Sequence, residues 1–519
     1  MEATGQRQVI MLGAENDALI AGKVGGVADV IRDLPVALAR LGWQTTVITP
    51  SYGFLHVKNP SQERAPVRFP FRGRELEAAV YEVTPRSPVK GVTHLVIEHP
   101  DMRGEPIYYN DPPEQTFARD ATKFAMFCSA AGMYLRDIDG SAVVHLHDWH
   151  TGTLLFLQQL HPAFRHLTRF RTVFTIHNLV IQGTRPIRGP VASVQQWFPE
   201  LFDDQSWIPR WRDPRFKEIV YTPMLAGIMY SRKLNTVSPS YANEILKPSQ
   251  HANGFYGGEG LEHFLREAHR KHRFFGILNG TEYPEGYAPR HLEWGEFCAE
   301  LGRELKSADK CEPLKEELLR RVGHMSSSPP KMMLTSVTRI VEQKMRILFE
   351  RGINGLPAWQ ELQQLLDRYD GVYCIVGNGT ADYERELREI SRESERILFF
   401  NFFSARVSEL LFANGTIFMM PSIFEPCGIG QMNAMRDGQP CIVHATGGLR
   451  DTIIDGVNGF QFAGTTYPEK VGHMLAVTEK AIRVVLSGAE RWESIRHNAA
   501  AARFTWDKSA RQYADLLYV

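Results

Sequence analysis

The chain of 519 residues carries 59 Lys and Arg and 59 Asp and Glu residues, and this net charge of zero argues against a nucleic acid partner, because binding to a polyanion depends on excess basic charge. Single hydrophobic cores stop growing at roughly 250–300 residues, so the length predicts two domains. The first residues lack the basic and apolar regions of a signal peptide, no apolar run of about 18 uncharged residues occurs and the cysteines are scattered, which predicts a cytoplasmic protein without a membrane segment.

Short β-rich runs alternate with helical patterns along the chain, which favours parallel sheets covered by helices on both faces. In the first half we expect strands near Val9–Gly13, Thr45–Thr49, His94–Ile97, Val143–Leu146, Thr172–Ile176 and Leu234–Val237. In the second half we expect them near Met332–Val337, Val372–Val376, Ile397–Phe400, Ile417–Met420 and Cys441–Ala445. The stretch Ser326–Pro330 separates the two series and suits a hinge. The predicted fold class is α/β, with two doubly wound domains that bind ligands between the carboxyl ends of their strands.

A glycine-rich segment follows the first expected strand. It reads Gly22-Lys23-Val24-Gly25-Gly26-Val27-Ala28-Asp29 and leads into a helical pattern of apolar residues. Adjacent glycines let the backbone approach a ligand closely, and the N–H groups at a helix start, together with Lys23, favour an anion. Taken alone, an ordinary glycine turn is an equally good interpretation.

Histidines cluster at the ends of two expected strands. The segment His145-Leu146-His147-Asp148-Trp149-His150 straddles one strand end, and His177-Asn178 follows another. A zinc site is the weaker interpretation of the first segment, because alternate residues of a strand point to opposite faces and the spacing matches no helix-borne metal pair. We expect this segment to line a substrate instead. A His-Asn pair can bond sugar hydroxyls, although a histidine satisfied within a turn would give the same pattern.

The second half of the chain places cations and glycines at strand ends. Arg339 and Lys344 follow an apolar strand and suit a diphosphate, since Arg offers a bidentate fork and Lys a point charge. Charges exposed at the surface are the alternative for any one such pair. Gly377 begins a glycine turn between a strand and a helix, which is typical of nucleotide-binding turns but a weak signal alone.

The most specific segment is Pro421–Gln431. An apolar strand delivers Glu425 to a turn framed by proline and glycine, and a helix that begins near Ile429 would point its N–H groups at the same cleft. The segment Thr446-Gly447-Gly448-Leu449 repeats the arrangement of strand, paired glycines and helix, which would leave further N–H groups free for phosphate.

In this order, the motifs resemble those of the bacterial glycogen synthase and plant starch synthase family, glycosyltransferase family 5, over essentially the whole chain. The similarity is carried by Lys23-Val24-Gly25-Gly26, His147-Asp148-Trp149-His150, Thr236–Ala242, Leu278-Asn279-Gly280, Arg339 with Lys344, Glu425-Pro426-Cys427-Gly428, Thr446–Thr452 and Phe504–Ala510.

This resemblance implies a GT-B fold, in which two Rossmann-like domains close on a nucleotide sugar. We expect an N-terminal domain over residues 1–325, a nucleotide-sugar-binding domain over 326–495, and a C-terminal helix over 496–519 that crosses back to the first domain. The implied activity is that of a retaining glucosyltransferase, which moves glucose from ADP-glucose or UDP-glucose to the non-reducing end of an α-1,4-glucan. No metal or other cofactor is implied, because cationic side chains replace it.

The resemblance also implies roles for individual residues. His177 would line the glucose, Arg339 and Lys344 would neutralise the departing diphosphate, and Glu425 would hold the glucosyl hydroxyls. Replacing Lys344 by Ala is then expected to lower turnover far more than folding stability. The residues implied in substrate or nucleotide binding are Lys23, Gly25, Gly26, Asp29, Asp148, Asn178, Asn279, Gly377, Cys427, Gly428, Thr446, Gly447 and Gly448.

The chain departs from the family pattern at a few positions. The segment from Glu15 to Lys23 is longer than usual, Thr281 stands where the family has Ile or Val, and Asn433 stands where an aromatic residue is common. Gly430 also replaces a larger polar residue. These departures keep one alternative open, a related GT-B glucosyltransferase with a different small acceptor. A catalytically dead glucan-binding protein is a further alternative, against which the intact Lys23, His177, Arg339, Lys344 and Glu425 speak.

Overall fold

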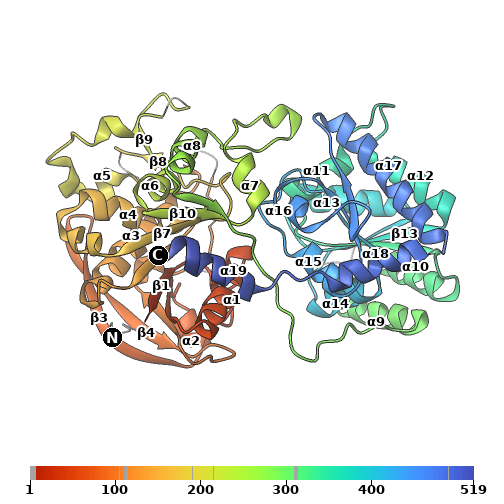
Figure 1. Ribbon diagram of the computed structural model, residues 1–519, viewed down its shortest axis with the longest axis horizontal. Coiled ribbons are helices and arrows are strands. Elements are labelled where there is room, and N and C mark those ends of the chain that lie inside the picture. Colours follow the sequence, from red (N-terminus) through yellow and green to blue (C-terminus); the bar gives the residue numbers. More distant parts are fainter. Residues whose placement is uncertain are drawn as a thin grey trace.

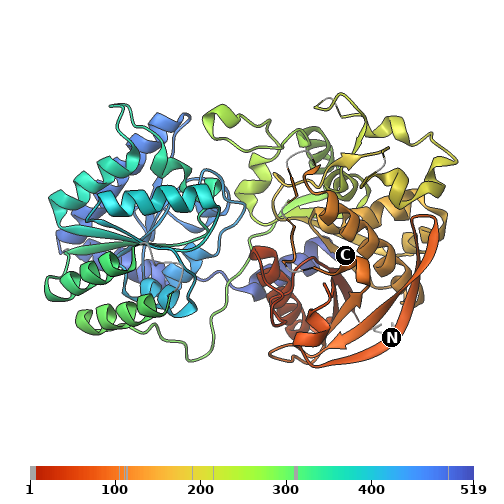
Figure 2. The ribbon, with the colours of Figure 1, turned by 180° about the vertical axis from the view of Figure 1, so that it is seen from behind.

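The computed structural model describes residues 7–104, 106–109, 111–112, 115–189, 191–213, 215–308, 314–488 and 490–519. These residues form two lobes side by side, each built around a twisted sheet with helices on its faces (Figure 1). The view from behind shows the same two lobes (Figure 2). The predicted α/β class with two Rossmann-like domains is therefore confirmed.

The sheet of the N-terminal domain has nine strands in the order β11-β10-β7-β6-β1-β2-β5-β4-β3. The strands are β1 Gln8–Leu12, β2 Gln44–Pro50, β3 Ser61–Phe71, β4 Arg74–Val83, β5 Val92–Glu98, β6 Val143–His147, β7 Arg171–Ile176, β10 Lys233–Thr236 and β11 Phe274–Gly276. Every strand expected in this half is present. The antiparallel hairpin β3–β4 and the edge strand β11 were not predicted. The first six residues of β3 are exposed, so this strand lacks the apolar run that marks a buried strand.

The second sheet has six strands in the order β14-β13-β12-β15-β16-β17, all of them parallel. They are β12 Met332–Val337, β13 Gly371–Val376, β14 Ile397–Phe400, β15 Ile417–Met420, β16 Cys441–His444 and β17 Gly459–Phe462. All strands expected here are present, and β17 is an additional edge strand. The carboxyl ends of the central strands β12 and β15 lead directly into the segments that carry Arg339 and Glu425.

Helices cover both sheets. The N-terminal domain has α1 Gly26–Arg40, α2 Leu55–Lys58, α3 Ala118–Tyr134, α4 Trp149–Leu160, α5 Val194–Trp197, α6 Pro223–Tyr230, α7 Pro239–Glu244 and α8 Glu262–Arg270, with a small sheet of β8 Arg185–Pro186 and β9 Val220–Tyr221. The later helices are α9 Trp294–Ser307, α10 Lys315–Ser327, α11 Glu342–Phe349, α12 Ala358–Tyr369, α13 Ala381–Glu393, α14 Ala405–Asn414, α15 Gly430–Arg436, α16 Gly447–Thr452, α17 Tyr467–Leu486, α18 Glu490–Ala501 and α19 Trp506–Gln512.

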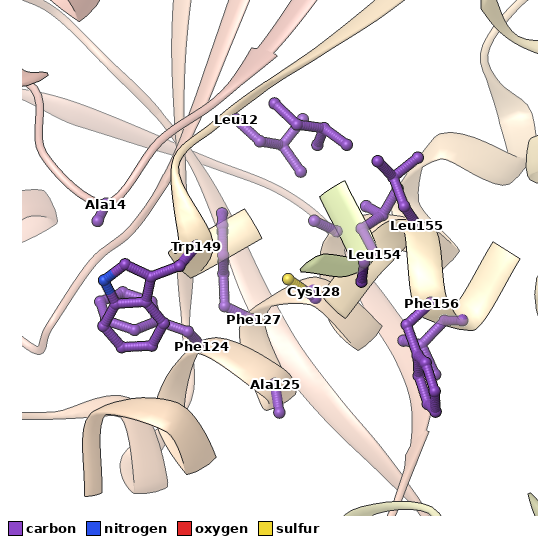
Figure 3. Packing of buried hydrophobic residues seen from close by; sticks show 14 of the residues in the cluster. Leu12, Ala14, Phe124, Ala125, Phe127, Cys128, Trp149, Leu154, Leu155 and Phe156 are labelled. Carbon is purple, nitrogen blue, oxygen red and sulfur yellow. The ribbon is translucent and has the colours of Figure 1, made fainter. Parts of the chain in front are cut away.

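The core of the N-terminal domain lies between its sheet and helices α3 and α4. Buried aromatic side chains from both helices meet there, as Figure 3 shows for Phe124 and Trp149. The ring centroids of these two residues are 5.5 Å apart in an edge-to-face arrangement. This packing fixes the start of α4, where the segment with several histidines leaves the end of β6.

The chain changes domain earlier than the predicted boundary at residues 325 and 326. Helices α9 and α10 pack on the second sheet, where Phe297 and Val322 share a buried cluster with Val372. Figure 1 likewise shows both helices beside the second sheet. The serine–proline stretch that suggested a hinge instead ends α10 and begins β12 within one domain. The crossing segment lies between β11 and α9.

The C-terminal segment returns to the first domain after α18. That helix still packs beside α15 in the second domain, so the return occurs between Ala501 and Trp506 rather than at residue 496. Helix α19 lies against α1, where Arg40 pairs with Asp507 at 2.6 Å and the indole of Trp506 donates to Asp33 at 3.0 Å.

No helix among the described residues is long and apolar enough to cross a membrane. Five cysteines lie in the described part of the chain, and all of them are buried free thiols. The sixth, Cys311, lies outside the described residues.

Candidate active site

A cavity of about 570 Å³ lies between the two domains and is lined by residues of both. Of the predicted site residues, those that line it are Gly25, Gly26, Asp29, Asp148, His177, Asn178, Asn279, Arg339, Lys344, Glu425, Cys427 and Gly428. The predicted residues that are not among its lining residues are Lys23, Gly377, Thr446, Gly447 and Gly448. Motifs that are far apart in the sequence thus meet at one site.

A buried ion pair occupies the second-domain wall of the cavity. The Lys344 ammonium pairs directly with the Glu425 carboxylate, and both side chains are almost fully buried. Burial lowers the pKa of Lys344, and the negative charge of Glu425 opposes that shift. The hydroxyl of Ser422 donates a further hydrogen bond of 3.0 Å to the same carboxylate oxygen. The pair fixes the Glu425 carboxylate and compensates the charge of Lys344.

Arg339 differs from Lys344 in having no carboxylate partner among the described residues. It is exposed, lines the same cavity, and follows β12 in a loop. Backbone hydrogen bonds hold this loop to the neighbouring turn, from Thr338 N to Val376 O at 3.1 Å and from Ile340 N to Asn378 O at 2.9 Å. The guanidinium is therefore a cation on a fixed loop, available to an anionic ligand.

Gly377 supports this loop and is not among the residues that line the cavity. Its φ is +153°, and a Cβ atom there would lie 1.8 Å from the carbonyl oxygen of Thr338. The structure thus gives Gly377 a packing role, because only glycine lets the two turns approach so closely.

The substitution Gly377→Ala should therefore displace the loop that carries Arg339. We expect turnover to fall by about tenfold or more, and the midpoint of thermal unfolding to fall with it, because the clash is with backbone atoms. Steady-state kinetics and calorimetry check both. Gly472→Ala is the control, because an added Cβ at Gly472 meets nothing within 4 Å. Full activity in Gly377→Ala would contradict this account of the loop.

Backbone N–H groups of the glycine-rich segment before α1 are bonded to a side chain of the same domain. The Glu15 carboxylate accepts hydrogen bonds from the N–H groups of Val24, at 2.7 Å, and Gly25, at 2.5 Å, and from the Tyr108 hydroxyl at 2.7 Å. The Gly25 amide, expected to be free for an anion, is therefore already satisfied. Glu15 itself lines the cavity, and its only signal in the sequence was its place just after the first strand.

Lys23 lies among carboxylates outside the cavity lining. Its ammonium is 3.3 Å from Asp17 and 2.5 Å from Asp29. Asp17 also pairs with Arg32, and with Arg86 at 2.7 Å. This network fastens the long segment between Glu15 and Lys23 to α1, and it pairs the Lys23 charge with Asp29, which itself lines the cavity.

The predicted amide donors before α16 are also engaged. Gly447 N donates to the Glu244 carboxylate at 2.9 Å, and Gly448 N donates to the Glu425 carbonyl at 3.1 Å. The Thr446 hydroxyl faces Glu244 as well, at 3.3 Å. These donors are therefore bonded to other protein groups, and their three residues are not among those that line the cavity. The sequence could not reveal this because Glu244 comes from the other domain.

The histidines at the ends of β6 and β7 form a buried polar chain. His147 Nδ1 and His177 Nε2 are 3.0 Å apart, and the His145 and His147 rings lie 4.1 Å apart. His145 bonds Tyr518 at 2.8 Å and Thr175 at 2.7 Å. Burial lowers the pKa of His177 to about 3, so its imidazole is neutral near pH 7. No group of three or more metal-ligating side chains is found in the part of the chain that the structure describes.

Asp148 follows these histidines in a strained backbone conformation. Its φ is +63°, and its carboxylate accepts the Trp149 N–H at 3.1 Å as the cap of α4. Burial raises the pKa of Asp148 well above its usual value. A non-glycine residue in the left-handed region costs on the order of 1–3 kcal/mol and is common at functional sites.

Another buried histidine makes stability sensitive to acid. Burial lowers the pKa of His94 to about 4, against about 6.5 in an unfolded chain. The His94 imidazole is therefore protonated below about pH 6.5 in the unfolded state, but only below about pH 4 in the folded state. The contribution of His94 to stability is full above pH 6.5 and is lost as the pH falls through that window. Between pH 7 and pH 5 the loss is about 2 kcal/mol.

Denaturant unfolding at pH 7 and pH 5 checks this prediction by comparison. The substitution His94→Gln removes the titrating group, so the variant should lose about 2 kcal/mol less than the unmutated chain over the same interval. An equal loss in both proteins would show that His94 is not buried and neutral.

Sequence reasoning missed an aromatic wall of the cavity. Tyr108, Tyr109, Phe117 and Trp149 line it on the N-terminal side, with the Asp120 carboxylate beside them. Of these, only Trp149 belongs to a motif. The two tyrosines and Phe117 lie in an irregular segment between β5 and α3, where no periodic pattern marks them.

Two of the departures from the family pattern are partners in the structure. The Thr281 hydroxyl donates to the Asn433 side-chain oxygen at 2.8 Å, and this bond joins the interdomain segment to α15. A hydroxyl and an amide thus replace together the apolar and aromatic residues that are common at these positions.

The fold and the site define a class. Two Rossmann-like domains share a cavity whose lining includes the cations Arg339 and Lys344 and the carboxylate Glu425, which is the arrangement expected of a glycosyltransferase of the GT-B fold. A family model described as starch synthase catalytic domain matches residues 8–267, and one described as glycosyl transferases group 1 matches residues 344–480. The chain belongs to the glycogen synthase and starch synthase family.

Individual relatives agree with this assignment. A glycogen synthase of Gloeobacter violaceus is 31% identical over 508 residues, covering 95% of each chain. A glycogen synthase of Anaeromyxobacter dehalogenans is 31% identical over 509 residues with the same coverage. Among solved structures, the catalytic domain of starch synthase IV from Arabidopsis thaliana, bound to ADP and acarbose, has the same fold. Its TM-score is 0.74 and its identity 23%, over 99% of both chains.

Proposed function

We propose that this enzyme is a retaining glucosyltransferase that moves glucose from ADP-glucose or UDP-glucose to the non-reducing end of an α-1,4-glucan. The observation that carries the proposal is that an unpaired cation and a fixed carboxylate line one cavity: Arg339 has no carboxylate partner in the part of the chain that the structure describes, while Lys344 holds Glu425 in place. The relatives of the chain include two enzymes named glycogen synthase and a starch synthase solved with bound ADP and acarbose, which supports a nucleotide-sugar donor and a glucan acceptor.

Breaking the bond between glucose C1 and the phosphate oxygen leaves negative charge on the nucleoside diphosphate. The Arg339 guanidinium would bind that diphosphate through its fork, and the Lys344 ammonium would add a second positive charge. Fixed cations at this position do the work that a divalent metal does in other phosphate-transfer sites, so the proposal includes no metal.

Glu425 and His177 would hold the glucosyl group. Neutral His177 can donate or accept a hydrogen bond with a sugar hydroxyl without titrating near pH 7. One Glu425 oxygen already binds Lys344 and Ser422, which makes the carboxylate a weak nucleophile. This favours a front-face displacement over a covalent route through Glu425. The acceptor oxygen bonds to C1 on the side from which the diphosphate leaves, and the acceptor proton passes to the departing phosphate oxygen.

The aromatic wall would bind the acceptor. Aromatic rings such as those of Tyr108 and Trp149 offer apolar surfaces to sugar rings, and the neighbouring Asp120 can accept hydrogen bonds from hydroxyls. A different small acceptor is the second candidate, because the long Glu15–Lys23 segment is flanked by Glu15 and Val24, which both line the cavity.

The test is nucleoside diphosphate release by the purified enzyme, with ADP-glucose and UDP-glucose each supplied with and without glycogen or maltooligosaccharides. Release that depends on glucan, from one donor, supports the proposal and identifies the base. Slow hydrolysis unaffected by glucan would favour another acceptor. No nucleoside diphosphate release from either donor, together with binding to glycogen, would favour a catalytically dead glucan-binding protein.

The carboxylates of Asp17 and Asp29 hold the Lys23 ammonium and so limit its access to a bound nucleotide sugar. Asp17→Asn removes one of the two charges that hold the Lys23 ammonium, so Lys23 can turn toward a bound diphosphate. We expect KM for the nucleotide sugar to fall about threefold to tenfold, on the scale of a partly exposed ion pair. The control Arg86→Gln breaks the 2.7 Å contact from Asp17 to Arg86 but keeps the contact to Lys23. An equal change in both variants would mean that loosening of the segment, not release of Lys23, is responsible.

A further inference from the structure

Helix α7 of the N-terminal domain lies at the junction of the two lobes, next to α16 of the second domain (Figure 1). It spans only Pro239–Glu244, directly after β10. Three of its polar residues, counting the cap Ser238, bond to the second domain. The known motifs give none of the three a part in the reaction.

The first end of α7 holds the turn that carries Glu425. The Ser238 hydroxyl donates to the carbonyl of Pro426, the next residue after Glu425, at 2.6 Å. The same oxygen accepts the Tyr241 N–H at 3.2 Å and so caps α7. One fully buried hydroxyl thus fixes a helix start in one domain and a turn in the other.

The other end of α7 holds the helix behind that turn. The Glu244 carboxylate, which is 7% exposed, accepts the Gly447 N–H at 2.9 Å across the domain junction. Between the two ends, Ser240 donates to Asp451 from its backbone at 2.8 Å and from its hydroxyl at 2.7 Å. Helix α16 is therefore bonded to α7 at both of its own ends.

Helix α16 in turn touches the Glu425 turn. Gly448 N donates to the Glu425 carbonyl at 3.1 Å. A Cβ on Gly447, whose φ is +43°, would lie 1.9 Å from that same carbonyl oxygen. The backbone of Glu425 is thus confined between α16 and the hydroxyl of Ser238.

We propose that α7 couples the joining of the two domains to the placement of Glu425, with Ser238, Ser240 and Glu244 as positioning residues. Apart from the Ser238 cap, their bonds described above cross the junction and exist only when the domains are together. Separation would expose the Glu244 carboxylate and free the Glu425 turn. The significance for catalysis rests on the proposed function of Glu425; the coupling itself rests on the contacts alone.

The test compares Glu244→Ala and Ser240→Ala with a matched control on the same helix. Asn243→Ala is that control, because Asn243 is exposed and, among the described residues, its side chain bonds within α7, to Pro239 O at 3.1 Å. We expect each test variant to lower kcat by about tenfold to a hundredfold, since one or two charged hydrogen bonds are lost. The dissociation constant of ADP or UDP should stay within about twofold, because the proposed diphosphate cations Arg339 and Lys344 are untouched. Glu244→Gln keeps an acceptor oxygen and should recover part of the activity.

Small-angle scattering, with and without the nucleotide, supplies a readout independent of turnover. The Glu244→Ala protein should have a larger radius of gyration than Asn243→Ala. An unchanged kcat and radius in both Glu244→Ala and Ser240→Ala would overturn the proposal, as would an equal effect of the control. If Glu244→Ala does not fold, the bond between Ser240 and Asp451 can be weakened from either domain, by Ser240→Ala or by Asp451→Asn. The two variants must then change kcat and the radius of gyration by similar amounts. If the unmutated chain binds neither nucleotide, the proposed function fails. The radii of gyration of the variants then test on their own whether α7 joins the two domains.

Discussion

Replacing Arg339 by Ala should lower kcat by about 10²–10³-fold, because it removes a preorganised cation at the place where negative charge develops. Among the basic side chains that line the cavity, Lys344 is already paired with Glu425, so Arg339 has no substitute. Its side chain is exposed, which means that folding stability should change by less than about 0.5 kcal/mol. Nucleoside diphosphate release and calorimetry on the same preparation separate the two effects.

The variant Arg339→Lys is the matched comparison. It keeps the positive charge and loses the bidentate fork, so its turnover should lie between those of the Ala variant and the unmutated enzyme. If turnover in Arg339→Ala stays within about threefold of normal, Arg339 does not stabilise the departing diphosphate.

The second large effect concerns the pair of Lys344 and Glu425. Glu425→Gln should lower turnover by about 10²-fold or more, because the hydroxyl-binding charge is lost and the orientation of Lys344 is released. It should also lower stability, since one partner of a buried ion pair costs on the order of 3–5 kcal/mol to remove. The same reasoning corrects the expectation for Lys344→Ala: its cost in stability will accompany its cost in turnover.

A double variant separates the structural and chemical roles of the pair. Lys344→Met with Glu425→Gln removes both charges at similar volume, so thermal stability should return most of the way to normal. Turnover should stay as low as in the single variants. Recovery of turnover together with stability would mean that the pair serves folding alone.

Much of the fold was predictable from local sequence. Strands such as β1 and β15 are buried apolar runs ended by glycine or proline, and the run itself identifies them. The hairpin β3–β4 carries polar residues at its exposed end and escaped prediction. The domain boundary failed for another reason: Ser326–Pro330 breaks a helix equally well inside a domain or between two, and only the packing of α9 and α10 on the second sheet decides.

Part of the cavity lining was predictable from motifs, but the bonds that its residues make were not. Arg339, Lys344 and Glu425 do meet in one cavity. The sequence could not indicate that Glu15 satisfies the Gly25 amide, or that Glu244 satisfies the Gly447 amide, because each partner is supplied by tertiary structure. It also gave no signal for Tyr108, Tyr109 and Phe117 of the aromatic wall, which lie between β5 and α3.

The most direct test of the central claim is transfer of ¹³C1-labelled glucose from ADP-glucose or UDP-glucose to maltoheptaose, followed by NMR of the product. The account predicts a new labelled anomeric carbon in an α-1,4 linkage, formed at the non-reducing end and absent with Arg339→Ala. A β-configured product, or labelled free glucose with the maltoheptaose unchanged, would contradict it.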